Sequence, residues 1–166
     1  MYPRMRRLYP WKPLVRNGSP TEQQSLKVPQ LSGLPGWLLL TRRPSSEAVA
    51  LSIDDKGGHQ EELTIVMDER MCSDTIFRTV RLSKDVFIVC DVWAINGTIV
   101  HPLANWAQRQ EWIADSLKLF HHPDFTALFT LADAPVGALV RGYEYYDGFP
   151  GSVGVFSRED VNGWNM

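Results

Sequence analysis

The chain has 166 residues, of which 44% are hydrophobic and 22% charged, and these values are ordinary for a globular protein and exclude a disordered chain. No apolar run approaches the roughly 20 residues that cross a bilayer, and no signal-type apolar core follows the basic first residues, so neither a membrane protein nor a secreted one is expected. Two cysteines, Cys72 and Cys90, are too few for a disulfide framework, and we expect a cytoplasmic or nuclear protein, or one inside a viral particle.

Residues 1–35 are predicted to form an extended basic arm. The net charge of −2 hides an asymmetry, because the first 16 residues carry five basic side chains and no acid, which leaves 12 basic against 19 acidic residues in the rest. Prolines at this density exclude a long helix. We expect the arm to dock on its own body or on a partner subunit. Its candidate partner-binding residues are Arg4, Arg6, Arg7, Trp11, Lys12 and Arg16.

Residues 36–166 are predicted to form one domain that begins with a β-hairpin. Trp37–Leu40 is the first core strand and Ala48–Ile53 its partner, joined through a turn that contains Arg42 and Arg43. Leu63–Met67 and Thr75–Leu82 are further strand candidates, because both are enriched in β-branched side chains.

The segment Val86–Phe120 carries the strongest local signals. Val86–Cys90 is an apolar run of strand length, in which Cys90 reads as a small buried hydrophobe, and Asn96-Gly97 is a hairpin-turn dipeptide. Asn105 followed by Gln108 has the spacing of a capping box at a helix start. The predicted helix buries one face, made by Trp106, Ile113, Leu117 and Phe120.

The last part of the chain is predicted to add one short helix and two strands. The helix is expected over His122–Phe129, and the strands over Gly137–Tyr146 and Val153–Phe156, around a turn at residues 147–151. Hairpins interrupted by helices indicate an α+β fold, with antiparallel sheets flanked by two or three helices.

Two clusters are candidates for binding an anion or a base. Arg141, Tyr143 and Tyr145 alternate onto one face of their strand, with Tyr146 on the other, and can stack bases and pair phosphate; alternatively they are half-buried strand residues. Arg42-Arg43 is a candidate anion site or a solvated turn. No metal is expected, because His121-His122 has no further ligand at suitable spacing and is explained by contact with a helix C-terminus.

Three stretches resemble the nucleotidyltransferase superfamily of DNA ligases, RNA ligases and mRNA capping enzymes. They are Gly36–Gly57, Thr75–Val100 and Pro135–Glu159, and Asp91–Gly97 fits the pattern of the family's central strand. The cap-binding domain of snurportin, which belongs to this superfamily and lacks its catalytic lysine, is the most similar in pattern. The resemblance implies a nucleotidyltransferase-like fold in which the first hairpin runs into a nucleotide pocket. Asp91 is then either a buried carboxylate or a ligand in that pocket.

The family's catalytic residues are missing at the matching positions. Its Lys-x-Asp-Gly element corresponds to Thr41-Arg42-Arg43-Pro44, and an arginine cannot replace the nucleophilic lysine because its guanidinium stays protonated. Its Asp-Gly-Glu corresponds to Phe77-Arg78-Thr79, and its closing-strand lysines to Phe156-Ser157-Arg158. The resemblance therefore implies no ligase or guanylyltransferase activity, and no cofactor is expected.

Two functions follow from a non-catalytic reading. The first is a structural or assembly subunit of a larger viral or ribonucleoprotein complex, in which the arm binds a protein partner. The alternative is a module that binds a nucleotide, an RNA end or a cap in the relict pocket. Its candidate contacts are Arg42, Arg43, Tyr143, Tyr145 and Phe156, and the last of these stands next to Val155, where snurportin has its cap-stacking tryptophan.

Overall fold

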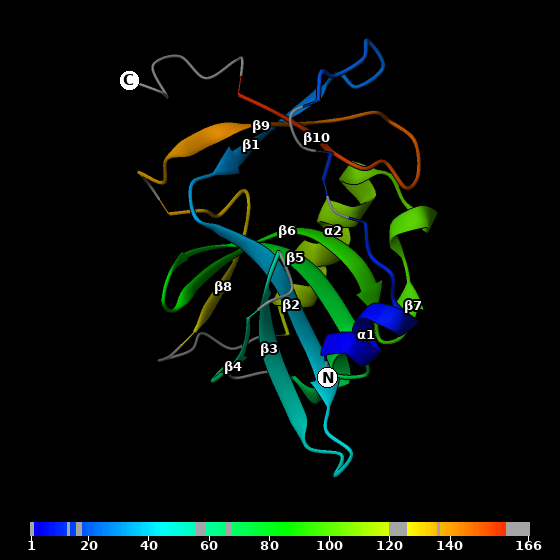
Figure 1. Ribbon diagram of the computed structural model, residues 1–166, viewed down its shortest axis with the longest axis vertical. Helices are drawn as coiled ribbons and strands as arrows, with labels where there is room; N and C mark the ends of the chain where they lie inside the picture. Colours follow the sequence, from blue (N-terminus) through cyan, green and yellow to red (C-terminus); the bar gives the residue numbers. More distant parts are fainter. Residues whose placement is uncertain are drawn as a thin grey trace.

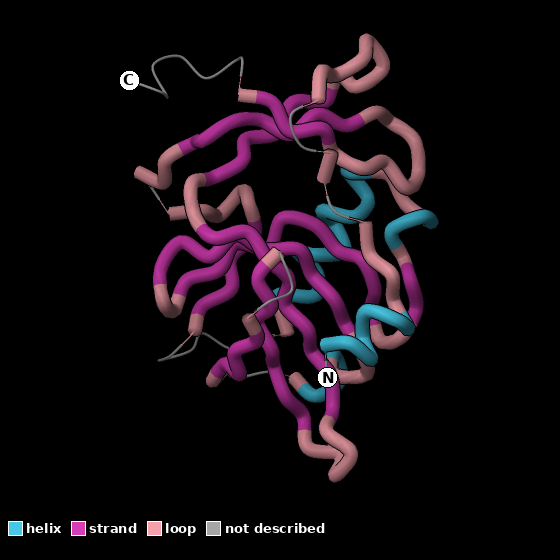
Figure 2. Tube along the Cα trace, in the orientation of Figure 1, coloured by secondary structure: helices cyan, strands magenta, loops and turns pink. Residues whose placement is uncertain are grey.

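The computed structural model describes residues 2–12, 14–15, 18–55, 59–65, 68–119, 126–135 and 137–158. Within these ranges it is an α+β fold built on two sheets (Figures 1 and 2). The larger sheet contains the strand order β4-β3-β2-β5-β6-β7, in which each strand is antiparallel to the next. Its strands are β2 (Leu34–Arg42), β3 (Ala48–Asp54), β4 (Gln60–Leu63), β5 (Thr75–Ser83), β6 (Val86–Ile95) and β7 (Thr98–Ile99).

The smaller sheet lies across one end of the larger one (Figure 1). Its order is β1-β9-β10, all antiparallel, with strands β1 (Leu26–Leu31), β9 (Val140–Tyr146) and β10 (Val155–Ser157). The chain passes from β1 to β2 through Ser32 and Gly33 alone, so one continuous segment ties the two sheets together.

The larger sheet is covered on both faces, which explains why its strands are apolar at consecutive positions. Trp37, Leu38, Leu39 and Leu40 of β2 are each at most 6% exposed. Leu38 and Leu40 pack on the side of helix α2 (Trp106–Leu117), whereas Trp37 and Leu39 pack on the side of the N-terminal residues. A strand buried on both faces loses the alternation of apolar and polar residues that a one-sided strand shows.

Local signals predicted from the sequence are confirmed around helix α2. The side chain of Asn105 accepts from the Gln108 N–H at 2.9 Å, and the side chain of Gln108 accepts from the Asn105 N–H at 3.0 Å, which is a complete capping box. Asn96 and Gly97 have φ values of 46° and 84°, as a tight hairpin turn requires. Cys90 is 6% exposed, and burial raises the pKa of its thiol to about 12.

Two predicted elements are wrong in type or place. Of the helix expected over His122–Phe129, residues 122–125 lie outside the described residues, and 127–129 belong to strand β8 (Ala127–Thr130), which pairs in parallel with the first half of β6. β7 pairs only with Ala94 and Ile95 at the end of β6, and β8 supplies partners for Val86–Val89 on the same edge. This tertiary demand overrides the local pattern. The strand expected over Leu63–Met67 is instead the polar edge strand β4, and Val66 and Met67 lie outside the described residues.

The arm predicted as extended contains regular structure and is part of the body. Helix α1 (Tyr2–Leu8) opens the chain, with Pro3 in its first turn, where a missing N–H costs nothing. β1 belongs to the smaller sheet, and the boundary expected after residue 35 falls inside β2. Met5, Tyr9 and Trp11 are buried in the core of the larger sheet. The burial of these apolar side chains explains why this segment follows the surface of its own body.

No helix in the described ranges combines the length and apolar character that crossing a membrane requires.

Candidate functional site

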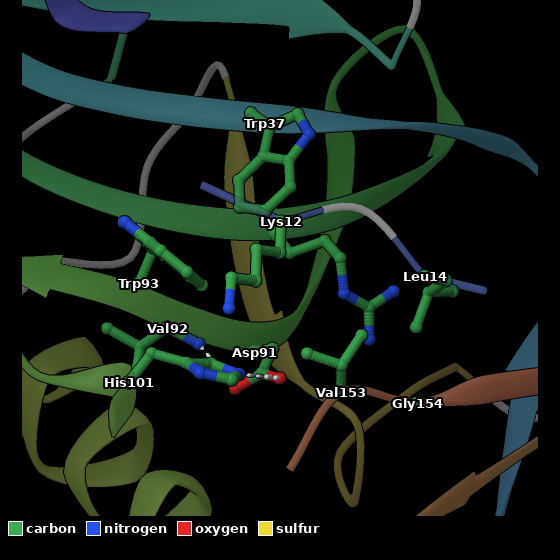
Figure 3. Close-up of a pocket in the computed structure, with 10 residues that line it drawn as sticks. Lys12, Leu14, Trp37, Asp91, Val92, Trp93, His101, Val153 and Gly154 are labelled. Atoms are coloured by element: carbon green, nitrogen blue, oxygen red, sulfur yellow. Dashed lines mark hydrogen bonds and ion pairs between the residues drawn. The ribbon is translucent and has the colours of Figure 1, made fainter. Parts of the chain in front are cut away.

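Between the two sheets lies a cleft whose walls come from six parts of the chain, among them the short 3-10 helix η2 (His101–Leu103), which contributes His101 (Figure 3). β2 contributes Trp37, β5 contributes Arg78, and β6 contributes three consecutive residues. The N-terminal segment closes one side, and the segment after β9 closes another. The lining residues are Lys12, Leu14, Trp37, Arg78, Asp91, Val92, Trp93, His101, Val153 and Gly154.

Arg78 and Glu144 join the two sheets across this cleft. The Arg78 guanidinium donates to both Glu144 carboxylate oxygens, at 2.7 and 3.2 Å. Tyr146 donates to the same carboxylate at 2.7 Å and Gln30 at 2.9 Å. Both carboxylate oxygens of Glu144 therefore accept hydrogen bonds from side chains inside the protein. Burial alone would lower the pKa of Arg78 and raise that of Glu144, but the opposite charge of each partner prevails, and both groups are held ionised.

Asp91 and Arg109 form a second buried ion pair on the α2 side. Arg109 is fully buried and donates to Asp91 from Nε at 2.8 Å and from Nη2 at 3.3 Å. Its remaining contacts are the carbonyls of Ala104 at 2.9 Å and Ser152 at 3.0 Å. The sequence left Asp91 open between a buried carboxylate and a pocket ligand. The structure shows a buried carboxylate that is paired with Arg109 and also lines the cleft.

His101 stacks on Trp93 at the cleft wall. The ring centroids are 4.8 Å apart, and His101 Nε2 lies 3.8 Å from Asp91 Oδ2. Burial lowers the pKa of His101 to about 4, and the repulsion of Arg109 and Arg78 adds to this while Asp91 opposes it. The imidazole is therefore neutral at physiological pH and presents an aromatic surface rather than a charge.

The register of the central strands explains why these charged groups lie together. Arg78 of β5 pairs with Asp91 of β6, and the register shifts on both sides of this pair, between residues 76 and 77 and between 78 and 79. Such bulges turn a strand locally and redirect its side chains. The bulges coincide with the two polar residues that β5 and β6 direct toward the cleft.

The cleft is nearly closed in this structure. The Lys12 side chain extends into it from the N-terminal segment (Figure 3), and Trp11 packs against Trp37 with a centroid distance of 5.1 Å. The space left is about 10 Å³, close to what one water molecule needs. A ligand larger than water requires a wall to move.

Arg42 and Arg43, the predicted anion-binding pair, do not line this cleft. Arg42 is the last residue of β2 and Arg43 follows it in the β2–β3 turn, at the end of the hairpin that points away from the smaller sheet (Figure 1). They line an open groove of about 630 Å³ together with Arg4 and Asp74. Both guanidinium groups are already paired, Arg42 with Glu69 at 3.2 Å and Arg43 with Glu62 and Glu47. A ligand anion would have to displace surface carboxylates there.

The aromatic candidates lie in the smaller sheet. Tyr143 is half-buried with the Lys27 ammonium 4.2 Å from its ring centroid, and Tyr145 is 8% exposed. Phe156 is 4% exposed, and its ring lies where a side chain on Gly142 would stand, at 2.4 Å from the position of an added Cβ. The structure therefore does not bring Tyr143, Tyr145 and Phe156 together with Arg42 and Arg43.

The arm residues are divided between core and surface. Trp11 is buried, Lys12 lines the cleft, and Arg6 lies over the Trp11 ring at 4.7 Å from its centroid. Arg4 and Arg7 are exposed, and Arg16 lies outside the described residues. Among the described residues no group of three or more His, Cys, Asp or Glu side chains is placed to hold a metal ion.

Sequence reasoning missed most of the cleft residues. Arg78 follows the buried Ile76-Phe77 of its strand, and a charge inside such a run is the signal that could have marked it as buried and paired. Trp37, Trp93 and His101 gave no signal of their own, because each is an ordinary core residue until β2, β6 and η2 (His101–Leu103) are placed beside each other.

The chain matches no known family model, and no curated protein matches it.

Proposed function

We propose that the protein is a non-catalytic binding module that takes a ligand with an aromatic ring and an anionic group, of the nucleotide or RNA-cap class, in the cleft between its two sheets. The observation that carries the proposal is the convergence of aromatic and cationic side chains there. Trp37, Trp93 and the neutral His101 supply rings, while Lys12 supplies a cation at the mouth.

The chemistry of these groups fits such a ligand. A base stacked on an aromatic side chain gains about 1–3 kcal/mol, whichever base it is. Arg78 and Asp91 lie deeper and are already paired with Glu144 and Arg109, so they form a rigid polar floor rather than free charges. Lys12 is exposed and has a flexible side chain, and it can follow a phosphate or carboxylate to its final position.

The absence of catalysis is part of the same proposal. The position of the family's nucleophilic lysine is occupied by Arg42 and Arg43, and their guanidinium groups pair with carboxylates at a distance from the cleft. The residues at the family's Asp-Gly-Glu position place a guanidinium, that of Arg78, where the family has carboxylates. Among the described residues, the one carboxylate that lines the cleft, that of Asp91, is already paired with Arg109.

An assembly role is the less favoured function. It was expected because a proline-rich, aromatic and basic extension is typical of chains that bind neighbouring subunits. The aromatic side chains Tyr9 and Trp11 are instead buried against the protein's own larger sheet. Because these aromatic side chains are buried in their own chain, they are not available to bind a neighbouring subunit.

A ligand screen with two charge-reversal variants tests the proposal. Thermal unfolding of the wild type is followed with ATP, GTP, a methylated cap analogue and short RNA, since a ligand that binds the native state raises the midpoint. For the ligand that binds, Lys12→Glu is expected to weaken affinity at least about tenfold, because it reverses the charge at the mouth. Lys27→Glu makes the same change on the outer side of the smaller sheet and is expected to bind normally. No shift with any member of the panel would contradict the proposal.

A further inference from the structure

The N-terminal residues Tyr9–Lys12 and Leu14–Val15, here called the strap, cross the mouth of the cleft. At one end Trp11 is buried against Trp37 of the larger sheet. At the other end Val15 pairs in parallel with Val155 of β10 in the smaller sheet. Lys12 and Leu14, between these ends, line the cleft itself. The strap thus bridges the two sheets over the space where the ligand is proposed to bind.

Trp11 packs against one of the rings that line the cleft. Its ring centroid lies 5.1 Å from that of Trp37 with an interplanar angle of 31°, which is a tilted aromatic contact. Trp37 is one of the rings that line the cleft, and the free space beside it is about 10 Å³. Because Lys12 and Leu14 of the strap also line this space, a base can enter beside Trp37 only when the strap moves away.

On the side of the larger sheet the strap is held by a hydrogen bond from Tyr9, whereas at its other end Val15 makes backbone hydrogen bonds with Gly154 and Phe156. The Tyr9 hydroxyl donates to Asp74 Oδ2 at 2.7 Å, and the other oxygen of Asp74 accepts from the Thr41 hydroxyl at 2.5 Å. Asp74 has a φ of 70°, a conformation that a non-glycine residue adopts at a cost, and it is the residue before β5. Its position is therefore fixed by the sheet, and Tyr9 is the side chain through which the strap binds to it.

We infer that the strap is an autoinhibitory lid, held shut by the Tyr9–Asp74 hydrogen bond, which must lift from Trp37 before the ligand can stack there. The inference rests on the proposed function for the identity of the ligand, but the latch itself is a property of the free protein. In a closed–open equilibrium, ligand affinity is reduced by the fraction of molecules that are open. Weakening the latch therefore raises apparent affinity without a new ligand contact.

Two variants that each remove one hydroxyl donor from Asp74 separate the latch from a general structural effect. Tyr9→Phe keeps the ring but removes the bond between strap and sheet, whereas Thr41→Val removes the bond within the sheet. Lid opening is read by hydrogen exchange at the Val15 and Phe156 amides, which donate to Gly154 and Val15 carbonyls at 3.0 and 2.9 Å. Amides of β2 serve as the internal reference for global unfolding.

Tyr9→Phe is expected to speed exchange of the Val15 and Phe156 amides at least about fivefold, the effect of one hydrogen bond, and to leave β2 amides unchanged. Thr41→Val is expected to change the Val15 and Phe156 rates by less than about twofold. Equal rates in Tyr9→Phe and the wild type, or equal acceleration in both variants, would overturn the latch.

The same proteins are then titrated with GTP and the methylated cap analogue. The lid predicts that whichever probe binds the wild type binds Tyr9→Phe more tightly by the factor measured in exchange. Faster exchange with unchanged affinity would overturn the lid as a gate. If neither probe binds either protein, the proposed function fails, and the exchange rates still decide whether the strap is latched.

Discussion

The Arg78 guanidinium of β5 and the Glu144 carboxylate of β9 form a buried two-point ion pair that connects the two sheets, with its shorter contact at 2.7 Å. The side chains are 10% and 2% exposed, and 66 positions separate them in the sequence. The ion pair joins the two sheets, and it holds Arg78 in place where that residue lines the cleft. It is therefore a structural condition for the proposed binding site.

Glu144→Gln is expected to destabilise the protein by about 3–5 kcal/mol, because it leaves the Arg78 charge buried without its counter-ion. Urea unfolding followed by circular dichroism measures the loss. Glu62→Gln removes a carboxylate from a surface ion pair with Arg43 and should change stability little. A loss in Glu144→Gln no larger than that of the surface control would show that the pair does not hold the sheets together.

Acid should destabilise the protein through His101. The folded pKa of about 4 lies below the ordinary value of 6.5 because burial disfavours the charged ring. The unfolded chain therefore binds a proton first, so the stability is fully present above pH 6.5 and is lost as the pH falls to about 4. This group alone contributes a loss of about 3 kcal/mol over that interval.

His101→Phe provides the control for this pH dependence, because it keeps a ring against Trp93 but cannot titrate. We expect a flatter dependence of the unfolding free energy on pH in His101→Phe, measured by urea titration at several pH values. His59→Gln, an exchange at an exposed position, should keep the wild-type dependence. Identical slopes for the wild type and His101→Phe would contradict the buried neutral state of His101.

A side chain at Gly97, the second residue of the β6–β7 turn, should lower the stability of the protein. Gly97 has a φ of 84°, and an added Cβ would meet no atom closer than 3.5 Å, so backbone strain alone decides the effect. Gly97→Ala is expected to cost about 1–2 kcal/mol. Gly148→Ala is the matched control, because nothing lies within 4 Å of its Cβ position and its φ is not in the left-handed region. Thermal unfolding of both variants measures the difference.

The features predicted correctly from sequence are those that depend on neighbours along the chain. The first hairpin, the Asn96-Gly97 turn and the Asn105 capping box each rest on residues a few positions apart, and all three are present. Residues 127–129 were wrongly predicted as the end of a helix, because their pairing with β6 arises from tertiary structure. Propensity in a four-residue window cannot include such a partner.

The site could not be predicted for a related reason. Its groups come from the segment after α1, from β2, β5, β6 and η2, and from the segment after β9. Residues that pair there, such as Arg78 and Glu144, are far apart in the sequence. The resemblance directed attention to Arg42 and Arg43, which lie at the far turn. Lys12 was assigned to the arm as a partner contact, and its place at the cleft follows only from the burial of Tyr9 and Trp11 beside it.

The most direct test of the binding cleft is an NMR titration that follows the indole signals of Trp37 and Trp93 while GTP and the methylated cap analogue are added. The account predicts that both indoles shift in step with ligand concentration, together with the backbone amide of Lys12, while signals of Tyr143 and Lys27 on the outer side of the smaller sheet stay in place. Shifts confined to Tyr143 and Lys27, or no shift at Trp37 and Trp93 with either ligand, would contradict it.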